Sequence, residues 1–184
     1  MNNSAFGSEK KYKLPLTEDD IVGLVCGDEL SLTGTVYTAR DAAHKKIVQL
    51  MERGEKLPFS PNNQTIYYVG PAPAKPGRVI GSCGPTTSGR MDKYTPTMLD
   101  AGIKIMIGKG PRSSEVIDSI KKNKALYLAA VGGAAALLAQ KVVAAEIVAF
   151  PELGPEAVYK LEIEDFPCFV AIDSQGKSIY NDRN

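Results

Sequence analysis

Three short segments of the sequence combine cationic side chains with glycine or hydroxyl residues, and each follows a predicted strand. These segments are Thr38–Asp41 with His44, Gly84–Arg90, and Gly108–Arg112. In α/β proteins, such segments lie at the carboxyl ends of strands, where helix N-termini and backbone N–H groups favour anions. If Arg40, Arg90 and Lys109 face one pocket, they would supply two planar guanidinium groups and one ammonium group. The sequence therefore predicts a site for a small dicarboxylate.

Other interpretations of these segments stay open at this point. Arginine and lysine near helix starts are often solvated surface charges, and the shared loop type is what favours a common site. The segment GSCGPTTSG has neither the GxGxxG order nor the GxxxxGK[ST] order of nucleotide-binding loops. Hydroxyls such as Thr86 and Thr87 commonly cap helices. The sole histidine, His44, lies four residues after Arg40 and either orients a ligand or has a structural role.

The elements that must position these residues alternate between strands and helices. Period-two and helical spacing of apolar residues predict the following order: strand 28–38, helix 40–53, strand 65–69, helix 91–99, strand 103–107, a helix capped by Ser113 or Ser114, strand 125–131, helix 134–140 and strand 147–150. Thr38 and Asp41 suggest a variant capping box, Gly102 a helix C-cap, and Gly132-Gly133 a tight turn. Strands over 158–163 and 168–172, a turn over 173–176 and a β segment over 178–180 end the chain. This alternation predicts an α/β fold.

Length and composition predict one soluble globular domain over residues 1–184, with residues 1–13 a loose N-terminal segment. Lys and Arg total 22 against 21 Asp and Glu, so the formal charge of +1 provides no general field for nucleic acid or an anionic membrane. The polar start has no apolar leader, and the most apolar stretch is too short to cross a membrane. We therefore expect a cytoplasmic protein. Its three cysteines, Cys26, Cys83 and Cys168, follow no metal or disulfide spacing.

Five motifs in order, TARDAAHKK, GPTTSGRMD, GKG, GGAAALLA and EDFPCFVAID, closely resemble the β subunit or C-terminal domain of class I fumarases, over nearly the whole chain after Leu14. The resemblance implies a swivelling β/β/α domain with a mixed sheet and helices packed on it. It further implies that the domain completes the active site of a cluster-bearing α subunit, with which it is expected to form a heterotetramer, and whose [4Fe–4S] cluster has three cysteine ligands. The present cysteines form no such ligand set, so the cluster is expected on the partner and no metal on this chain.

Carried over by motif, the resemblance assigns Arg40, Arg90 and Lys109 to the substrate carboxylates and Thr86 to proton transfer at the carbon next to a carboxylate. Asp41, His44 and Thr87 are possible supporting residues. A threonine alcohol is a poor base in water, so this role needs local activation. In that family, the iron without a protein ligand acts as a Lewis acid on the substrate.

The expected activity is reversible hydration of fumarate to L-malate. The β subunit of L(+)-tartrate dehydratase carries the same type of GPTTS loop and is the near alternative, since L-malate and L(+)-tartrate differ by one hydroxyl. A non-catalytic anion-binding regulatory domain, working without a metal-bearing partner, is the alternative from another class. An open reading frame beside this one that encodes a chain with three separated cysteines favours the enzyme.

Overall fold

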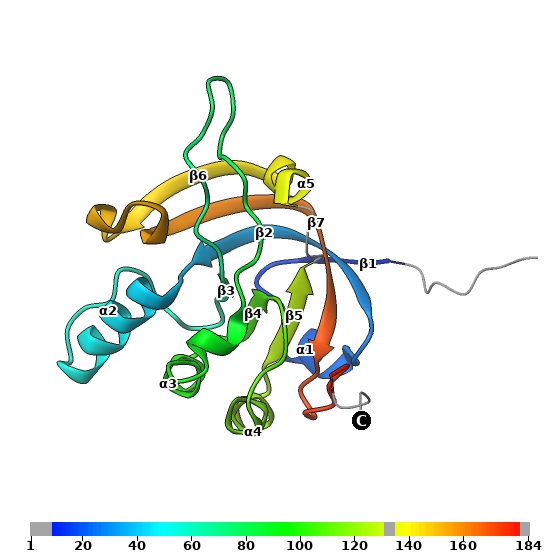
Figure 1. Cartoon of the computed structure of the whole chain (residues 1–184). Helices are drawn as coiled ribbons and strands as arrows, with labels where there is room; N and C mark the ends of the chain where they lie inside the picture. Colours follow the sequence, from blue (N-terminus) through cyan, green and yellow to red (C-terminus); the bar gives the residue numbers. More distant parts are fainter. Residues whose placement is uncertain (1–8, 131–134, 181–184) are drawn as a thin grey trace, which may run out of the picture.

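The computed structural model describes residues 9–130 and 135–180. Its strands are β1 (Lys10–Lys13), β2 (Glu29–Thr38), β3 (Thr65–Tyr67), β4 (Ile105–Gly108), β5 (Leu126–Ala130), β6 (Val142–Ala149) and β7 (Val158–Ile172). Its α-helices are α1 (Glu18–Gly23), α2 (Asp41–Glu52), α3 (Thr95–Asp100), α4 (Ser114–Asn123) and α5 (Ala135–Gln140). Two 3-10 helices, η1 (Ser88–Met91) and η2 (Pro151–Glu156), complete the set (Figure 1).

The strands form one mixed sheet in the order β1-β2-β3-β4-β5-β7-β6. Strands β2 to β5 run parallel to one another, whereas β7 is antiparallel to β5, β6 and β2. Because the long strand β2 pairs with both β3 and β7, the pairings close a ring of strands through β2, β3, β4, β5 and β7. The parallel strands end on the same side of the molecule, so the loops after them are neighbours.

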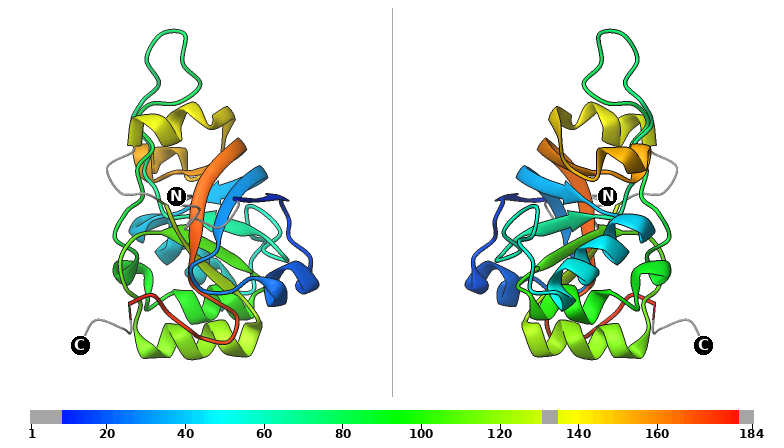
Figure 2. Two further views of the ribbon diagram at one scale, coloured as in Figure 1. Left: turned by 90° about the vertical axis from the view of Figure 1, so that its right-hand side faces the viewer. Right: turned by 90° about the vertical axis from the view of Figure 1, so that its left-hand side faces the viewer.

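Two buried clusters hold these layers together. One lies between the parallel strands and the long, bent strands β2 and β7, where Tyr67, Ile107 and Phe166 are fully buried. The other lies under α2, α3 and α4, which cover the opposite face of β3 to β5 (Figures 1 and 2). Successive residues of a strand point to opposite faces, so Ile66 joins the second cluster and Tyr67 the first. The predicted α/β fold with a mixed sheet and packed helices is confirmed.

Several local predictions are confirmed in detail. Ser113 caps α4, since its hydroxyl accepts a hydrogen bond from the Val116 amide. Gly102 follows α3 with a φ of +112°, and its amide donates to the Leu99 carbonyl, as expected for a glycine that ends a helix. The turn at Asp173 is closed by the Gly176 amide, which donates to the Asp173 carbonyl.

Other local predictions are wrong. Within the predicted loose segment 1–13, Lys10–Lys13 form β1 beside β2, because backbone pairing can order a polar stretch without apolar side chains, while residues 1–8 lie outside the described residues. Thr38 ends β2 and does not cap α2, since its hydroxyl donates to the Ala157 carbonyl and accepts from the Tyr159 amide. The helix begins with Arg40 at the N-cap position and has no side-chain cap.

The C-terminal strands also differ from their predicted bounds. The two predicted segments 158–163 and 168–172 form one strand, β7, because Asp165 absorbs the irregularity with a φ of +47° while its amide bonds the Thr33 hydroxyl. Strand β6 starts earlier than predicted, at Val142. Ser178 makes only an isolated bridge to Ile172, so the last β segment is wrong. The predicted Gly132-Gly133 turn lies outside the described residues.

Candidate functional site

The three predicted loops lie together at the carboxyl ends of β2, β3 and β4. Thr38 is in register with Tyr67 on the neighbouring strand, and Tyr67 is in register with Ile107. The chain then returns to this edge, where the Thr86 amide donates to the Tyr68 carbonyl at 2.7 Å. Thr87 forms a parallel bridge with Lys109. The structure therefore brings the loops of Arg40, Thr86 and Lys109 side by side.

The loop that carries Thr86 and Arg90 is locked to the loop that carries Lys109 through Ser88. The Ser88 amide donates to the Lys109 carbonyl at 2.9 Å, and the Lys109 amide donates to the Ser88 hydroxyl at 3.0 Å. Gly108 is required for this contact, because a Cβ at this position would lie 2.0 Å from the Ser88 hydroxyl oxygen. The backbone of both loops is thus fixed, while the side chain of Lys109 stays exposed.

Asp41 joins the two predicted arginines of the site. Its Oδ2 lies 3.2 Å from Nη2 of Arg90 and 4.0 Å from Nε of Arg40. Arg40 also lies 3.9 Å from Oε1 of Glu156, at the end of η2. Its Nε is nevertheless buried without a hydrogen-bond partner among the described residues. The two guanidinium groups therefore converge on one carboxylate, and one of them keeps an unsatisfied donor.

The predicted hydroxyls do not cap a helix in this structure. Thr87 occupies the N-cap position of η1, but its side chain makes no capping hydrogen bond. Thr86 is half-buried, and no hydrogen bond of its hydroxyl occurs within residues 9–130 and 135–180. The capping interpretation of these two threonines thus has no support in the geometry. Thr86 presents a positioned hydroxyl that remains available to a ligand.

His44 is a buried, neutral side chain beneath this edge. Its Nδ1 lies 2.9 Å from the Arg40 carbonyl oxygen, which only accepts, so Nδ1 carries the proton. The ring stacks against Tyr94 and meets Tyr68 edge-on. Burial lowers the pKa of His44 to about 4. These contacts favour the structural role for His44 over contact with a ligand, since they hold the carbonyl at the start of α2.

The sequence analysis did not assign roles to Arg112 and Asp92, although Arg112 ends the segment Gly108–Arg112 and Asp92 ends the motif GPTTSGRMD. The Arg112 side chain is fully buried, and its Nε donates to Oδ1 of Asp92 at 2.6 Å. Nη2 donates to the Thr95 hydroxyl at 2.7 Å, and the second oxygen of Asp92 accepts from the Ser113 amide at 2.7 Å. The pair therefore ties the segment after Arg90 to the segment after Lys109.

Two tyrosines enclose the Arg112 guanidinium. Its central carbon lies 5.3 Å from the Tyr68 ring centroid and 4.9 Å from that of Tyr127. Burial acts to lower the pKa of Arg112, but interactions with Tyr68 and Asp92 outweigh it and the pKa is raised. Burial has the opposite effect on Tyr127 and raises its pKa; the phenol lies 2.9 Å from the Ser88 hydroxyl oxygen and donates to the Gly110 carbonyl. The only sequence signal for this network was two opposite charges in loops rich in glycine and proline.

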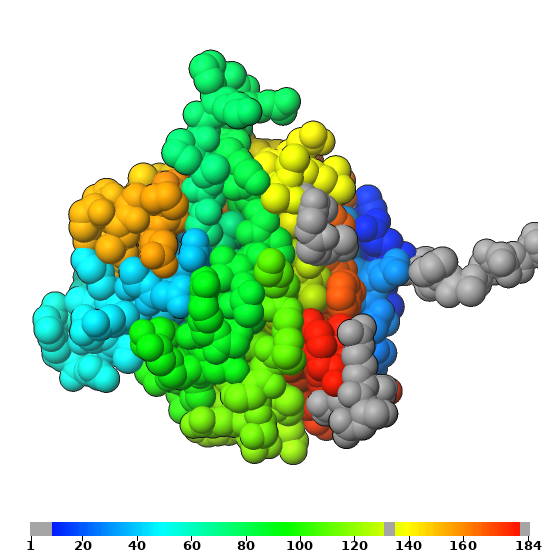
Figure 3. Space-filling view, viewed as in Figure 1, coloured from blue at the N-terminus to red at the C-terminus, as the bar shows by residue number. Residues whose placement is uncertain are grey.

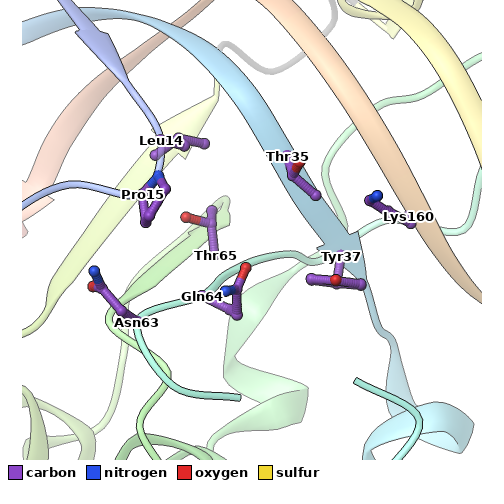
Figure 4. A pocket seen from close by; sticks show the side chains of 8 residues that line it. All are labelled: Leu14, Pro15, Thr35, Tyr37, Asn63, Gln64, Thr65 and Lys160. Carbon is purple, nitrogen blue, oxygen red and sulfur yellow. The ribbon is translucent and has the colours of Figure 1, made fainter. Parts of the chain in front are cut away.

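A separate cavity of about 220 Å³ lies at the amino end of β3 (Figure 4). It contains none of the predicted site residues. Its lining consists of Leu14, Pro15, Thr35, Tyr37, Asn63, Gln64, Thr65 and Lys160. The predicted site is instead part of the outer surface, where the start of α2 meets the segment around η1 (Figure 3). A surface of this kind needs a second body to exclude water from a ligand.

The described cysteines do not fit the ligand set of an iron–sulfur cluster. Cys83 and Cys168 are buried, and burial raises the pKa of the Cys83 thiol to about 12 and that of Cys168 further. Within residues 9–130 and 135–180, no three His, Cys, Asp or Glu side chains are grouped so that they could hold a metal ion. Which chain carries a cluster stays a prediction.

No helix among the described residues is long and apolar enough to span a membrane.

The structure is an α/β domain in which the loops of Arg40, Arg90 and Lys109 lie at one edge of the sheet. The model of the fumarase C-terminus family matches residues 5–183, and the chain belongs to that family. It is 46% identical over 153 residues to the aerobic class I fumarate hydratase of Salmonella typhimurium, covering 82% of this chain and 26% of that protein. It is 43% identical over 175 residues to a putative L(+)-tartrate dehydratase subunit beta of Methanocaldococcus jannaschii, covering 92% and 90%.

A putative class I fumarate hydratase of Geobacillus stearothermophilus is 35% identical over 173 residues, covering 91% of this chain and 33% of that protein. The chain therefore spans only a quarter to a third of these fumarate hydratases but most of the tartrate dehydratase subunit. The predicted resemblance to both kinds of protein is confirmed.

Proposed function

We propose that this chain is the substrate-binding β subunit of an iron–sulfur-dependent hydro-lyase that reversibly hydrates fumarate to L-malate. A partner α subunit would carry the cluster, in a cytoplasmic heterotetramer. The observation that supports this most is the position of Asp41, whose Oδ2 lies within 4.0 Å of both Arg40 and Arg90. Two guanidinium groups that converge on one carboxylate of the protein can also converge on a carboxylate of a substrate.

In this proposal, the chain's own residues bind and orient the dicarboxylate. Arg90 binds one carboxylate of the substrate once that carboxylate has displaced Asp41, and Arg40 lies beside the same position, with its Nε 4.0 Å from Oδ2 of Asp41. The exposed ammonium of Lys109, on the neighbouring loop, neutralises the other carboxylate. Exposed ion pairs contribute about 0–1 kcal/mol, so exchanging Asp41 for a substrate carboxylate costs little. Three cations held at both ends of a rigid trans-dicarboxylate fix its double bond for attack.

Thr86 would exchange the proton on the carbon next to a carboxylate. Hydration adds a hydroxyl to one carbon of the double bond and a proton to the other, and the reverse reaction removes that proton. The Thr86 backbone is fixed by its hydrogen bond to Tyr68, and its hydroxyl is uncommitted among the described residues. Because an alcohol in water exchanges such protons poorly, the partner must exclude water and activate this hydroxyl.

Reconstitution tests this proposal. The chain purified alone under anaerobic conditions should contain no stoichiometric iron and should not hydrate fumarate, because its described cysteines do not fit a cluster. Addition of the anaerobically purified α subunit should produce fumarate hydration that rises until an equimolar complex is reached. Activity of the isolated chain, or equal activity of the α subunit without it, would contradict the shared site.

The role of Thr86 is tested in the reconstituted complex. Thr86→Ala should lower kcat by about 10²–10⁴-fold with little change in the melting temperature, as expected for proton transfer. Thr97→Ala, at an exposed threonine of α3, is the matched control. An unchanged kcat with a lower melting temperature for Thr86→Ala would instead assign this threonine a structural role.

Dehydration of L(+)-tartrate is the second candidate activity. It is favoured by the match to the tartrate dehydratase subunit beta, of which this chain covers 90%. The two substrates share both carboxylates and differ in hydroxyl groups, so the same arginines serve either reaction. Comparing kcat/KM of the complex for fumarate, mesaconate and L(+)-tartrate decides between them. A chain that binds dicarboxylates tightly with no effect on any α subunit would instead be the non-catalytic regulatory domain.

A further inference from the structure

A projecting segment follows β3 and extends beyond β6 and α5, away from the body of the molecule (Figures 1 and 2). We call residues 70–83 the arm. Every residue from Ala72 to Val79 is exposed, whereas Val69, Ile80 and Cys83 at its base are buried. Figure 3 shows it rising alone above the surface. The arm therefore contributes little to the core.

The arm has a defined conformation, as expected of a binding element. Its two legs are joined by hydrogen bonds between the Ala72 amide and the Ser82 carbonyl, 2.9 Å, and between the Gly81 amide and the Ala72 carbonyl, 3.1 Å. A Cβ at Gly81 would lie 2.4 Å from the backbone oxygens of Ala72 and Pro73, so the legs approach too closely for any other residue. The neck of the arm is thus specified by sequence.

The tip of the arm is a tight turn over Lys75-Pro76-Gly77-Arg78. The Arg78 amide donates to the Lys75 carbonyl at 3.0 Å, and Gly77 has a φ of +74°. Proline followed by a glycine with positive φ is the signature of a type II turn. A tip built in this way is ordered before it meets a partner, which lowers the entropy lost on binding.

The surface of the arm defines the chemistry of its partner. The exposed stretch APAKPGRV carries two cationic side chains and no carboxylate, and Val79 is 49% exposed. At the base of the arm, the Cys83 amide donates to the Ala135 carbonyl of α5, where Leu137 is 50% exposed. The arm and α5 together present apolar side chains flanked by positive charge. They fit an acidic groove with an apolar floor.

The arm is continuous with the candidate site. Its base leads within three residues to Thr86, whose amide is bonded to Tyr68 at the other end of the same loop. The arm and the loop of Thr86 are thus parts of one continuous segment that is fixed at its base. The match covers 26% of the fumarate hydratase of Salmonella typhimurium, so about three quarters of that protein lies outside the matched region.

We propose that the arm is the docking element for the α subunit and inserts Lys75, Arg78 and Val79 into an acidic groove on it. This inference rests on the proposed function, which supplies the α subunit as the occupant. Binding at the arm brings the partner over the sheet edge and excludes water from it. A second copy of this chain is the competing occupant, and the test separates the two.

The test uses charge reversal on the full chain. Titration calorimetry with the purified α subunit from the same organism compares the unaltered chain with Lys75→Glu/Arg78→Glu. Its matched control is Lys13→Glu/Lys56→Glu, at two exposed lysines remote from the arm in the fold. The arm variant should weaken Kd by about tenfold or more, with an effect that shrinks at high salt, and the control by less than about twofold. Because the Lys75 and Arg78 side chains are exposed among the described residues, the melting temperature should not change.

A second pair of variants tests the apolar contact. Val79→Asn should weaken Kd severalfold, whereas Val25→Asn, at a valine of similar exposure on the far side of the fold, should not. Equal Kd values for the arm variants and the unaltered chain would overturn the docking role. So would self-association of this chain that is lost in Lys75→Glu/Arg78→Glu. If the unaltered chain fails to bind the α subunit at all, the proposed function fails instead.

Discussion

Two arginine–aspartate pairs at the same sheet edge show opposite designs. Arg112 and Asp92 are 2.6 Å apart, with the Arg112 side chain 0% exposed, whereas Arg90 and Asp41 are 3.2 Å apart, with the Arg90 side chain 50% exposed. Removing one partner of a buried pair leaves a charge without water, but an exposed pair exchanges freely with solvent and ligands. The first pair therefore fixes the loops, whereas the second is open to exchange with solvent.

The largest expected effect comes from breaking the buried pair. Arg112→Met should lower the free energy of unfolding by about 3–5 kcal/mol, because the Asp92 carboxylate and the Thr95 hydroxyl lose their partner. Chemical denaturation of the isolated chain measures it. Arg90→Met is the control and should cost less than about 0.5 kcal/mol. Similar losses for the two variants would remove the distinction between the pairs.

Changing the exposed pair should lower kcat/KM but leave the free energy of unfolding unchanged. Arg90→Lys keeps the charge but loses the planar guanidinium group. The transition-state stabilisation calculated from kcat/KM of the reconstituted complex should therefore fall by about 2–4 kcal/mol. Its free energy of unfolding should match that of the unaltered chain. Near-normal turnover of Arg90→Lys would place this arginine outside the site.

The buried His44 has a structural role, and the free energy of unfolding should therefore depend on pH through this residue. Its pKa is about 4 in the folded chain against an ordinary value of 6.5, so the unfolded chain binds the proton first as pH falls. The stability that this group confers is complete above pH 6.5 and is lost toward pH 4. Between about pH 7.5 and pH 5 the loss should be about 2 kcal/mol.

Denaturation at a series of pH values, with His44→Gln alongside, checks this prediction. The variant should be less stable overall but should lose the slope in this window. Glu18 and Asp20 do not interfere, because hydrogen bonds to Lys124 and Thr17 lower the pKa of these carboxyls below values of 4.5 and 3.8. The same slope in both proteins would mean that His44 is not the buried titrating group.

The smallest effect is expected at Asp41, the aspartate of the exposed pair. Asp41→Asn should change the free energy of unfolding by less than about 0.5 kcal/mol, whereas Asp92→Asn should cost about 1–3 kcal/mol. Thermal denaturation of the two variants at low and high salt measures the difference. A large loss for Asp41→Asn would show that Asp41 holds the loops and does not merely occupy the place of a ligand.

Spacing and residue type alone predicted the α/β alternation, the Ser113 and Gly102 caps and the loops of Arg40, Arg90 and Lys109, because these depend on neighbours within a few residues. The family motifs predicted the kind of protein. They did not predict that Lys10–Lys13 pair with β2, since a polar strand has no periodic apolar signal.

Only the tertiary structure decided what each charge does. Arg90 and Arg112 are both arginines in glycine-rich loops, and nothing within either loop distinguishes them. Their roles differ because Tyr68, Tyr127 and Asp92 surround Arg112, and these residues come from separate parts of the chain. Burial, and hence the energy of a charge, depends on contacts between distant segments, which local patterns do not contain.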